Sequence, residues 1–303
     1  MAATAINGKA AAAIDGSSPA TATVCVTGAA GFMGSWLVKR LLEKGYTVHG
    51  TVRDPDNKAK VSHLLSLPGA EERLKLFRAE LSEEGSFDAA VAGCDGVFHV
   101  ATPTEFAPKD PQNDLIKPAI EGTLNALKAC TKAKTVKRIV VTSSAATVSI
   151  NESPEQNQYI DESCWTDVNF LQTKTPPAWA YPVSKTLAEQ AAWEYAKKHG
   201  LDMVTIIPVL VVGPAITPMV PSSIQLALSP LTGNPQFFGG LKGMQIVSGS
   251  ISLVHVEDVC SAQIFLMENL KAQGRHICCP INTSVPQLVE YLAKRYPHYN
   301  VPT

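Results

Sequence analysis

A glycine-rich turn between a strand-like run and a helical run constrains the fold of this chain most strongly. The apolar run Thr23–Val26 comes first, the turn Thr27–Gly34 follows, and a helical pattern begins at Trp36. Glycines allow a backbone to approach a pyrophosphate, which then lies at the positive end of the helix. The turn by itself also fits a tight strand-to-helix connection without a ligand.

Strand-like and helical segments alternate along much of the chain, which is typical of a parallel, doubly wound sheet in an α/β fold. Strands are predicted at Thr23–Val26, Thr47–Val52, Leu74–Phe77, Val97–Val100, Arg138–Val141 and Met203–Ile207. After Pro208, prolines interrupt the alternation. We expect a disordered tail at 1–22 and a Rossmann-type dinucleotide-binding domain at 23–208. Residues 209–303 should form mainly a smaller substrate lobe, from which some chain returns to the first domain.

Tyr181 and Lys185 stand four residues apart at the head of an apolar helical pattern. That spacing places a phenol and an ammonium on one face of a helix. A positive charge beside a phenol lowers the tyrosine pKa, so the hydroxyl exchanges protons near neutral pH. The same spacing also arises by chance, as a packing tyrosine beside a solvated lysine. Thr142–Ser144 ends a predicted strand, where parallel sheets bind ligands, and therefore favours the catalytic interpretation.

The glycine turn, the strand-end serine and the Tyr/Lys pair occur in one characteristic order. From residue 23 onward the chain resembles the short-chain dehydrogenase/reductase superfamily, extended type. The strings at 97–103, 183–189 and 207–214 are similar to the plant flavonoid branch, which includes dihydroflavonol and anthocyanidin reductases. The segments 241–250 and 254–259, together with Tyr181-Pro182, resemble the anthocyanidin reductases in particular.

The residue after the second predicted strand indicates which dinucleotide binds. NAD-preferring sites usually carry an acidic residue there, which holds the ribose hydroxyls. This chain has Arg53, which can pair with a 2′-phosphate, and Lys60 adds a second charge. In the alternative interpretation Asp54 binds the ribose and Arg53 is a surface residue. The resemblance implies the first arrangement, with NADPH (NADP) as the cofactor.

The resemblance also implies the roles of the other site residues. Ser144 hydrogen-bonds the substrate oxygen, Tyr181 moves the proton, and Lys185 tunes Tyr181 and holds the nicotinamide ribose. Glu80 stands where relatives usually have an aspartate near the adenine. The expected cofactor-binding residues are Gly28, Ala30, Gly31, Phe32, Met33, Arg53, Lys60, Glu80, Leu81, Val100, Ala101, Thr102, Thr142, Tyr181, Lys185, Pro208 and Ser223. The expected substrate-binding residues are Phe106, Ser144, Ser149 and Tyr181.

By resemblance, the chain is an NADPH-dependent oxidoreductase that reduces anthocyanidins to 2,3-cis flavan-3-ols such as epicatechin. Reduction of dihydroflavonols to leucoanthocyanidins is the alternative. Ser149 favours the first, because dihydroflavonol reductases often have an asparagine there, and serine offers fewer hydrogen bonds to a B-ring. A glycine-rich loop expected at Leu241–Ser250 favours it as well. Val183 and the segment 161–165 point the other way.

A protein of another class also fits the fold, namely a dinucleotide-sensing protein without catalysis. Such proteins have lost the catalytic tyrosine. The intact set of Ser144, Tyr181 and Lys185 argues against this alternative.

Charge and cysteine content restrict the partners. With 26 basic and 27 acidic residues, the formal net charge of -1 gives no overall field that attracts nucleic acid or anionic lipid. Seven cysteines without a CxxC pair suggest reduced thiols rather than disulfides or a zinc site. No apolar run approaches the ~18 residues of a membrane span. We expect a cytoplasmic enzyme with a small flavonoid substrate and no metal.

Several other residues are interpreted as structural. Gly122 and Asn125 lie near the middle of a predicted helix at 114–132, where close packing and a buried hydrogen bond explain them. His99 ends the fourth strand among apolar neighbours, which indicates a packed histidine. His255 begins a helix.

Overall fold

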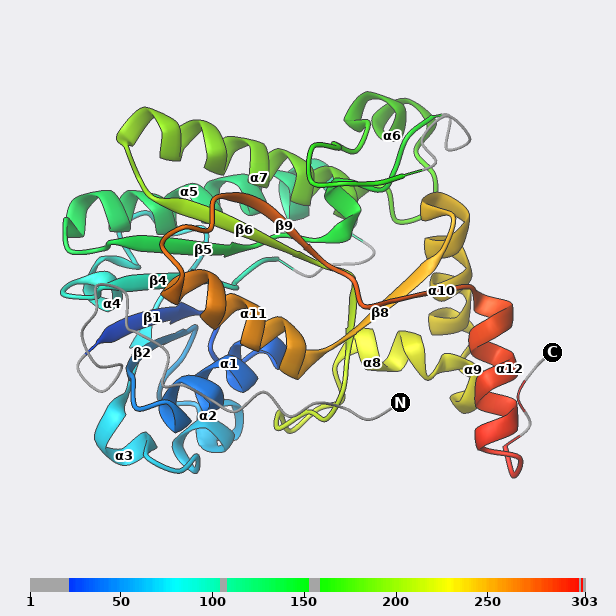
Figure 1. The fold of residues 1–303 in the computed structure, drawn as a ribbon, viewed down its shortest axis with the longest axis horizontal. Helices are drawn as coiled ribbons and strands as arrows, with labels where there is room; N and C mark the ends of the chain where they lie inside the picture. Colours follow the sequence, from blue (N-terminus) through cyan, green and yellow to red (C-terminus); the bar gives the residue numbers. More distant parts are fainter. Residues whose placement is uncertain (1–21, 104–107, 153–158, 300, 302–303) are drawn as a thin grey trace.

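The computed structural model describes residues 22–103, 108–152, 159–299 and 301. One large sheet, covered by helices on both faces, lies beside a smaller C-terminal lobe (Figure 1). The seven strands of the large sheet are parallel and follow the order β3-β2-β1-β4-β5-β6-β9. Their bounds are β1 Thr23–Thr27, β2 Thr47–Val52, β3 Leu74–Arg78, β4 Gly96–His99, β5 Arg138–Thr142, β6 Met203–Pro208 and β9 Gly274–Cys278.

The α/β fold with a doubly wound parallel sheet is therefore confirmed. The strand order reverses between β1 and β4, and ligands of such sheets bind outside the carboxyl ends of the strands at this point. The glycine-rich turn follows β1 directly, so the chain places it at the binding crevice.

Two helical layers cover the sheet because its strands alternate their side chains between two apolar clusters. In β1, Val24 and Val26 belong to one cluster and Cys25 to the other. The first layer consists of α1 (Phe32–Glu43), α2 (Lys58–Leu65), α3 (Ala70–Arg73) and α11 (Val256–Glu268). The second consists of α4 (Asp88–Val91), α5 (Lys117–Ala133) and α7 (Ala180–His199), and α5 runs beside α7 (Figure 1).

Short elements connect this framework to the site. A π-helical turn, η2 (Gln112–Ile116), precedes α5, and a 3-10 turn, η3 (Ala145–Thr147), follows β5. Helix α6 (Val168–Lys174) lies between η3 and α7 in the chain and begins at the N-cap Asp167, whose side chain accepts a hydrogen bond from the Phe170 amide.

The C-terminal lobe has its own sheet and core. Its strands are β7 (Leu210–Val212), β8 (Ile251–His255) and β10 (Ile281–Thr283), in the mixed order β10-β8-β7. Its helices are α8 (Ser222–Ala227), α9 (Ser229–Thr232), α10 (Pro235–Ser248) and α12 (Val285–Arg295). Between these elements the chain returns to the large sheet as α11 and β9, and β9 pairs with β6.

The loop expected at Leu241–Ser250 is wrong, because these residues belong to α10 as far as Ser248. Strong end signals outweigh the glycines inside the helix. The Asn234 side chain caps the first turn, Pro235 occupies its first position, and Gly249 ends the helix with φ +77. Gly239, Gly240 and Gly243 therefore lie within a helix and do not favour anthocyanidins through a glycine-rich loop.

The structural interpretation of Gly122 and Asn125 is confirmed. A Cβ at Gly122 would lie 2.7 Å from Leu81 Cβ, and Asn125 Nδ2 donates to the Leu81 carbonyl at 2.9 Å. Helix α5 thus fixes the loop that follows β3. Of the expected tail, residues 1–21 lie outside the described part. Ala22 is buried, and its carbonyl accepts from the Thr47 amide at 3.1 Å.

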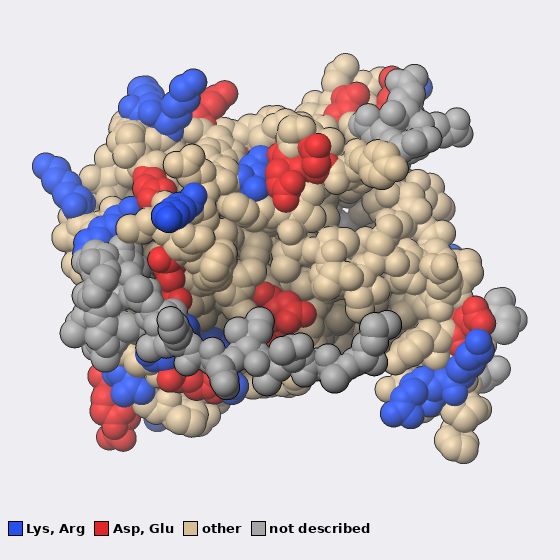
Figure 2. Space-filling model, in the orientation of Figure 1, with Lys and Arg blue, Asp and Glu red and all other residues tan. Residues whose placement is uncertain are grey.

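Acidic and basic side chains are interspersed on the face shown in Figure 2, around a broad area without charge. Within the described ranges, no helix has the length and apolar character that crossing a membrane requires.

Candidate active site

The glycine-rich turn between β1 and α1 is packed so tightly that side chains do not fit. Gly28 has φ +66, and a Cβ there would lie 3.0 Å from Ala101 Cα. A Cβ at Gly34 would lie 2.2 Å from the Gly28 carbonyl oxygen. The N-cap residue of helix α1 is Gly31, which has no side chain, so no side chain competes with an anion for the first amides of the helix. The turn fits the pyrophosphate of a dinucleotide.

Thr27 joins this turn to the end of β4. Its Oγ1 accepts hydrogen bonds from the Val100 and Ala101 amides, both at 3.0 Å. Its own proton therefore goes to His99 Nδ1, 3.0 Å away, which leaves the other ring nitrogen of His99 protonated. Burial, followed by the charge of Lys185, lowers the pKa of His99 to about 3. The histidine is a neutral packed residue, as expected.

Arg53 follows β2 at the same edge of the sheet. Its side chain is 82% exposed and its Nε lies 3.9 Å from Glu80 Oε1, which is too weak a contact to hold it. Lys60 is exposed in the first turn of α2. Asp54 instead accepts from the Asp56 amide at 3.0 Å and so stabilises a local turn.

The end of β5 and the start of α7 bring Ser144 and Tyr181 together. Their side chains hydrogen-bond each other, and Ser144 Oγ also accepts from the Ala146 amide at 3.3 Å. Lys185 Nζ donates to the Thr142 carbonyl at 3.0 Å and is buried. The three catalytic candidates therefore meet at one strand end, on elements that are far apart in the sequence.

The pKa of Tyr181 shifts in the direction opposite to the one expected from its spacing to Lys185. Burial raises the pKa of Tyr181, and the hydrogen bond from Ser144 opposes this. Burial also lowers the pKa of Lys185 to about 8, while the charge of Glu189 raises it. The phenol is therefore held neutral near pH 7, which is the form that donates a proton.

The other predicted positions are spread over several elements. Pro208 ends β6, Ser223 lies in α8, and Ser149 follows η3 and is partly exposed. Leu81 and Thr102 are also partly exposed. Phe106 lies outside the described residues. Within the described ranges, no group of three or more His, Cys, Asp and Glu side chains is arranged to hold a metal.

Sequence reasoning missed the residues behind the catalytic strand end. Gln263 Nε2 on α11 donates to Thr142 Oγ1 at 2.7 Å, and Glu189 on α7 pairs with Arg275 on β9. The i+4 spacing from Lys185 to Glu189 was readable in the sequence. Arg275 was not, because β9 was not predicted.

Curated relatives match the chain over most of its length. A Ginkgo biloba protein provisionally named anthocyanidin reductase is 78% identical over 93% of this chain and 83% of its own length. An anthocyanidin reductase of Vitis vinifera, named as (2S)-flavan-3-ol-forming, is 57% identical over 93% of this chain and 83% of its own length. A bifunctional dihydroflavonol 4-reductase/flavanone 4-reductase of Malus domestica is 53% identical over 93% of this chain and 78% of its own length.

Solved structures agree with the fold. Vestitone reductase from alfalfa has a TM-score of 0.77 at 40% identity, covering 93% of this chain and 84% of that one. Gre2 from Candida albicans, in complex with NADPH, has a TM-score of 0.77 at 28% identity, covering 91% of this chain and 83% of that one. The pattern of the NAD dependent epimerase/dehydratase family matches residues 24–279. The chain therefore belongs to this family, the extended short-chain dehydrogenases/reductases, as an anthocyanidin reductase-like NAD(P)-dependent reductase.

Proposed function

We propose that this protein is an NADPH-dependent reductase that converts anthocyanidins to 2,3-cis flavan-3-ols. The observation that carries the reaction type is the meeting of Ser144, Tyr181 and Lys185 at the carboxyl end of β5, at the same edge of the sheet as the glycine turn. The names of the relatives at 78% and 57% identity support the substrate class.

The residues that follow β2, near the glycine-rich turn, support NADPH rather than NADH. The Arg53 guanidinium is exposed and only weakly paired, so it is available to a 2′-phosphate, and Lys60 follows in α2. Asp54 is engaged in its own turn, which weakens the alternative in which it binds the ribose. The adenine would lie near Glu80 and Leu81, and the ribose path near Val100–Thr102. When bound, NADPH supplies the hydride.

The chain's own residues position the substrate and move the proton. Ser144 and Tyr181 hydrogen-bond a substrate oxygen, and Tyr181 transfers the proton as a neutral phenol. Lys185, anchored by the Thr142 carbonyl, places a positive charge where negative charge develops and holds the nicotinamide ribose. Ser149 would offer the B-ring one hydroxyl.

Reduction of dihydroflavonols is the second candidate, because a relative that carries out this reaction is 53% identical. A sensing protein without catalysis is disfavoured, since the catalytic set is complete and assembled. We also propose a cytoplasmic location, which suits seven unpaired cysteines.

Initial rates with two substrates test the choice. We expect NADPH absorbance to fall with cyanidin about tenfold or more faster than with dihydroquercetin, a difference that pocket contacts can supply. The measurement uses equal concentrations of each flavonoid and purified full chain. Faster consumption with dihydroquercetin would make the second candidate correct, and no consumption with any flavonoid would favour the sensing protein.

A further inference from the structure

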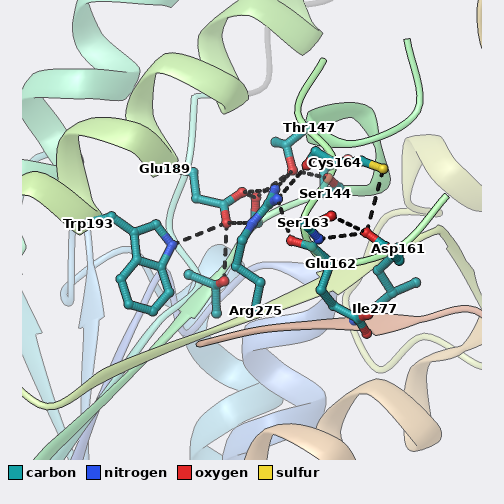
Figure 3. Close-up of polar contacts among 12 residues, drawn as sticks. Ser144, Thr147, Asp161, Glu162, Ser163, Cys164, Glu189, Trp193, Arg275 and Ile277 are labelled. Carbon is teal, nitrogen blue, oxygen red and sulfur yellow. Dashed lines mark hydrogen bonds and ion pairs between the residues drawn. The ribbon is translucent and has the colours of Figure 1, made fainter. Parts of the chain in front are cut away.

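A buried ion pair lies directly behind the proposed catalytic groups. Arg275 Nε on β9 lies 2.7 Å from Glu189 Oε1 on α7, and the two side chains are only 8% and 1% exposed. Figure 3 shows the guanidinium between Glu189 on one side and the segment from Asp161 to Cys164 on the other. Burying two charges is costly, so a pair of this kind needs further hydrogen bonds to both partners.

Both oxygens of the Glu189 carboxylate are saturated by donors. Ser143 Oγ donates to Oε2, Thr205 Oγ1 donates to Oε1 at 3.1 Å, and Trp193 Nε1 donates to Oε1 at 3.4 Å. Burial by itself would raise the pKa of Glu189, but the hydrogen bonds from Arg275 and Ser143 lower it below its usual value. Glu189 is therefore a fixed negative charge at neutral pH.

Arg275 is held equally firmly. Its guanidinium donates to the Glu162 carbonyl at 2.9 Å and to Thr147 Oγ1 at 3.0 Å, and it stacks 3.7 Å above the Trp165 ring. It also donates to the Cys164 carbonyl at 2.5 Å. These contacts tie β9, η3 and the segment before α6 into one unit.

This unit adjoins the catalytic groups in two ways. Glu189 lies four residues after Lys185 on the same face of α7, and both side chains line one small cavity together with His99. Ser143, which donates to Glu189, immediately precedes Ser144. The charge of Glu189 acts on Lys185, while its hydrogen bonds hold the strand end.

We propose that Glu189, locked in place by Arg275, is a positioning residue whose negative charge keeps Lys185 in its ammonium form and whose hydrogen bonds hold the strand end that carries Ser144. This inference rests on the proposed function, because it assigns Glu189 a task in the same acid/base site.

The groups that face Lys185 permit a clear assignment of its titration. His99 on β4 has a pKa of about 3 and is neutral over the working range. Burial raises the pKa of Tyr181 on α7, so it titrates above neutrality. Arg275 on β9 is paired with Glu189 at 2.7 Å. A decrease of kcat/KM near pH 8 is therefore assigned to the deprotonation of Lys185, whose pKa is about 8.

The test is the pH dependence of Glu189→Gln, which removes the charge and keeps the shape. Because Glu189 raises the pKa of Lys185, its loss should move the alkaline limb of kcat/KM to lower pH by about one pH unit. The affinity for NADPH, measured by fluorescence titration across the same pH range, should show its alkaline decrease shifted to lower pH by the same amount. This second readout does not depend on turnover, so an inactive wild type would overturn the proposed function without deciding the role of Glu189.

Thr205→Val is the matched control, because it deletes one hydrogen bond to Glu189 and leaves the carboxylate. In this variant, the alkaline decrease of kcat/KM and of NADPH affinity should occur at the wild-type pH. The double variant Glu189→Gln/Arg275→Met removes both buried charges and so avoids an unpaired guanidinium if the single variant does not fold. The double variant should show the same shift of the alkaline decrease to lower pH as Glu189→Gln. The proposal would be overturned if the pH profiles of every folded Glu189 variant coincide with those of the wild type. An equal shift in Thr205→Val would overturn it as well.

Discussion

Replacing Tyr181 with phenylalanine is expected to reduce turnover by about 10²- to 10⁴-fold, the usual contribution of a positioned proton donor. The change removes only the hydroxyl that hydrogen-bonds Ser144 and leaves the ring on α7. NADPH affinity should change little, because the glycine turn and Arg53 are untouched. Steady-state rates with cyanidin and fluorescence titration with NADPH measure the two effects separately.

Tyr195→Phe is the matched control on the same helix. Its hydroxyl lies 3.3 Å from Thr131 Oγ1, away from Ser144, so the variant deletes an equivalent group outside the site. We expect wild-type turnover. Near-normal activity in Tyr181→Phe, or an equal loss in Tyr195→Phe, would contradict the assignment of Tyr181 as the proton donor.

Replacing Arg53 with alanine is expected to weaken NADPH binding by about 10- to 100-fold, since a hydrogen bond to a charged group contributes about 1.5 to 3 kcal/mol. The exposed side chain has only a weak contact with Glu80, so its removal should not disturb the fold. NADH affinity should barely change, because that cofactor lacks the 2′-phosphate. Dissociation constants for both cofactors provide the measurement.

Arg78→Ala provides a control for the general loss of positive charge. Arg78 ends β3, the neighbour of β2, and pairs with Glu83 at 2.9 Å. We expect a much smaller decrease in NADPH affinity than for Arg53→Ala. Equal losses of NADPH and NADH in Arg53→Ala would instead mean that Arg53 supports the structure.

The part of the fold that has a strong local pattern was predictable from the sequence. The strand at Thr47–Val52 was predicted with its observed bounds, and five others were predicted to within one residue at each end. The strands β1, β4, β5 and β6 are buried along almost their whole length, and burial on both faces of a parallel sheet leaves an almost continuous hydrophobic run. The edge strand β3 instead showed alternating apolar residues, Leu74 and Leu76, followed by Phe77.

The remaining elements lack such a signal. Strand β9 lies at the edge of the sheet and contains the charged Arg275, which is paired only in three dimensions. Helix α10 contains Gly239, Gly240 and Gly243, so its composition favours a loop, whereas the helix is defined by its end signals at Asn234 and Gly249. Sequence spacing placed Tyr181 and Lys185 on one face, but the direction of their pKa shifts depends on burial, which only the fold determines.

The most direct test of the proposed function is the stoichiometry of cyanidin reduction, with the products separated on a chiral column. We expect two NADPH to be oxidised for each 2,3-cis flavan-3-ol formed, and the product to be absent when NADPH is omitted. One NADPH oxidised per leucocyanidin formed from dihydroquercetin, with cyanidin unchanged, would contradict it.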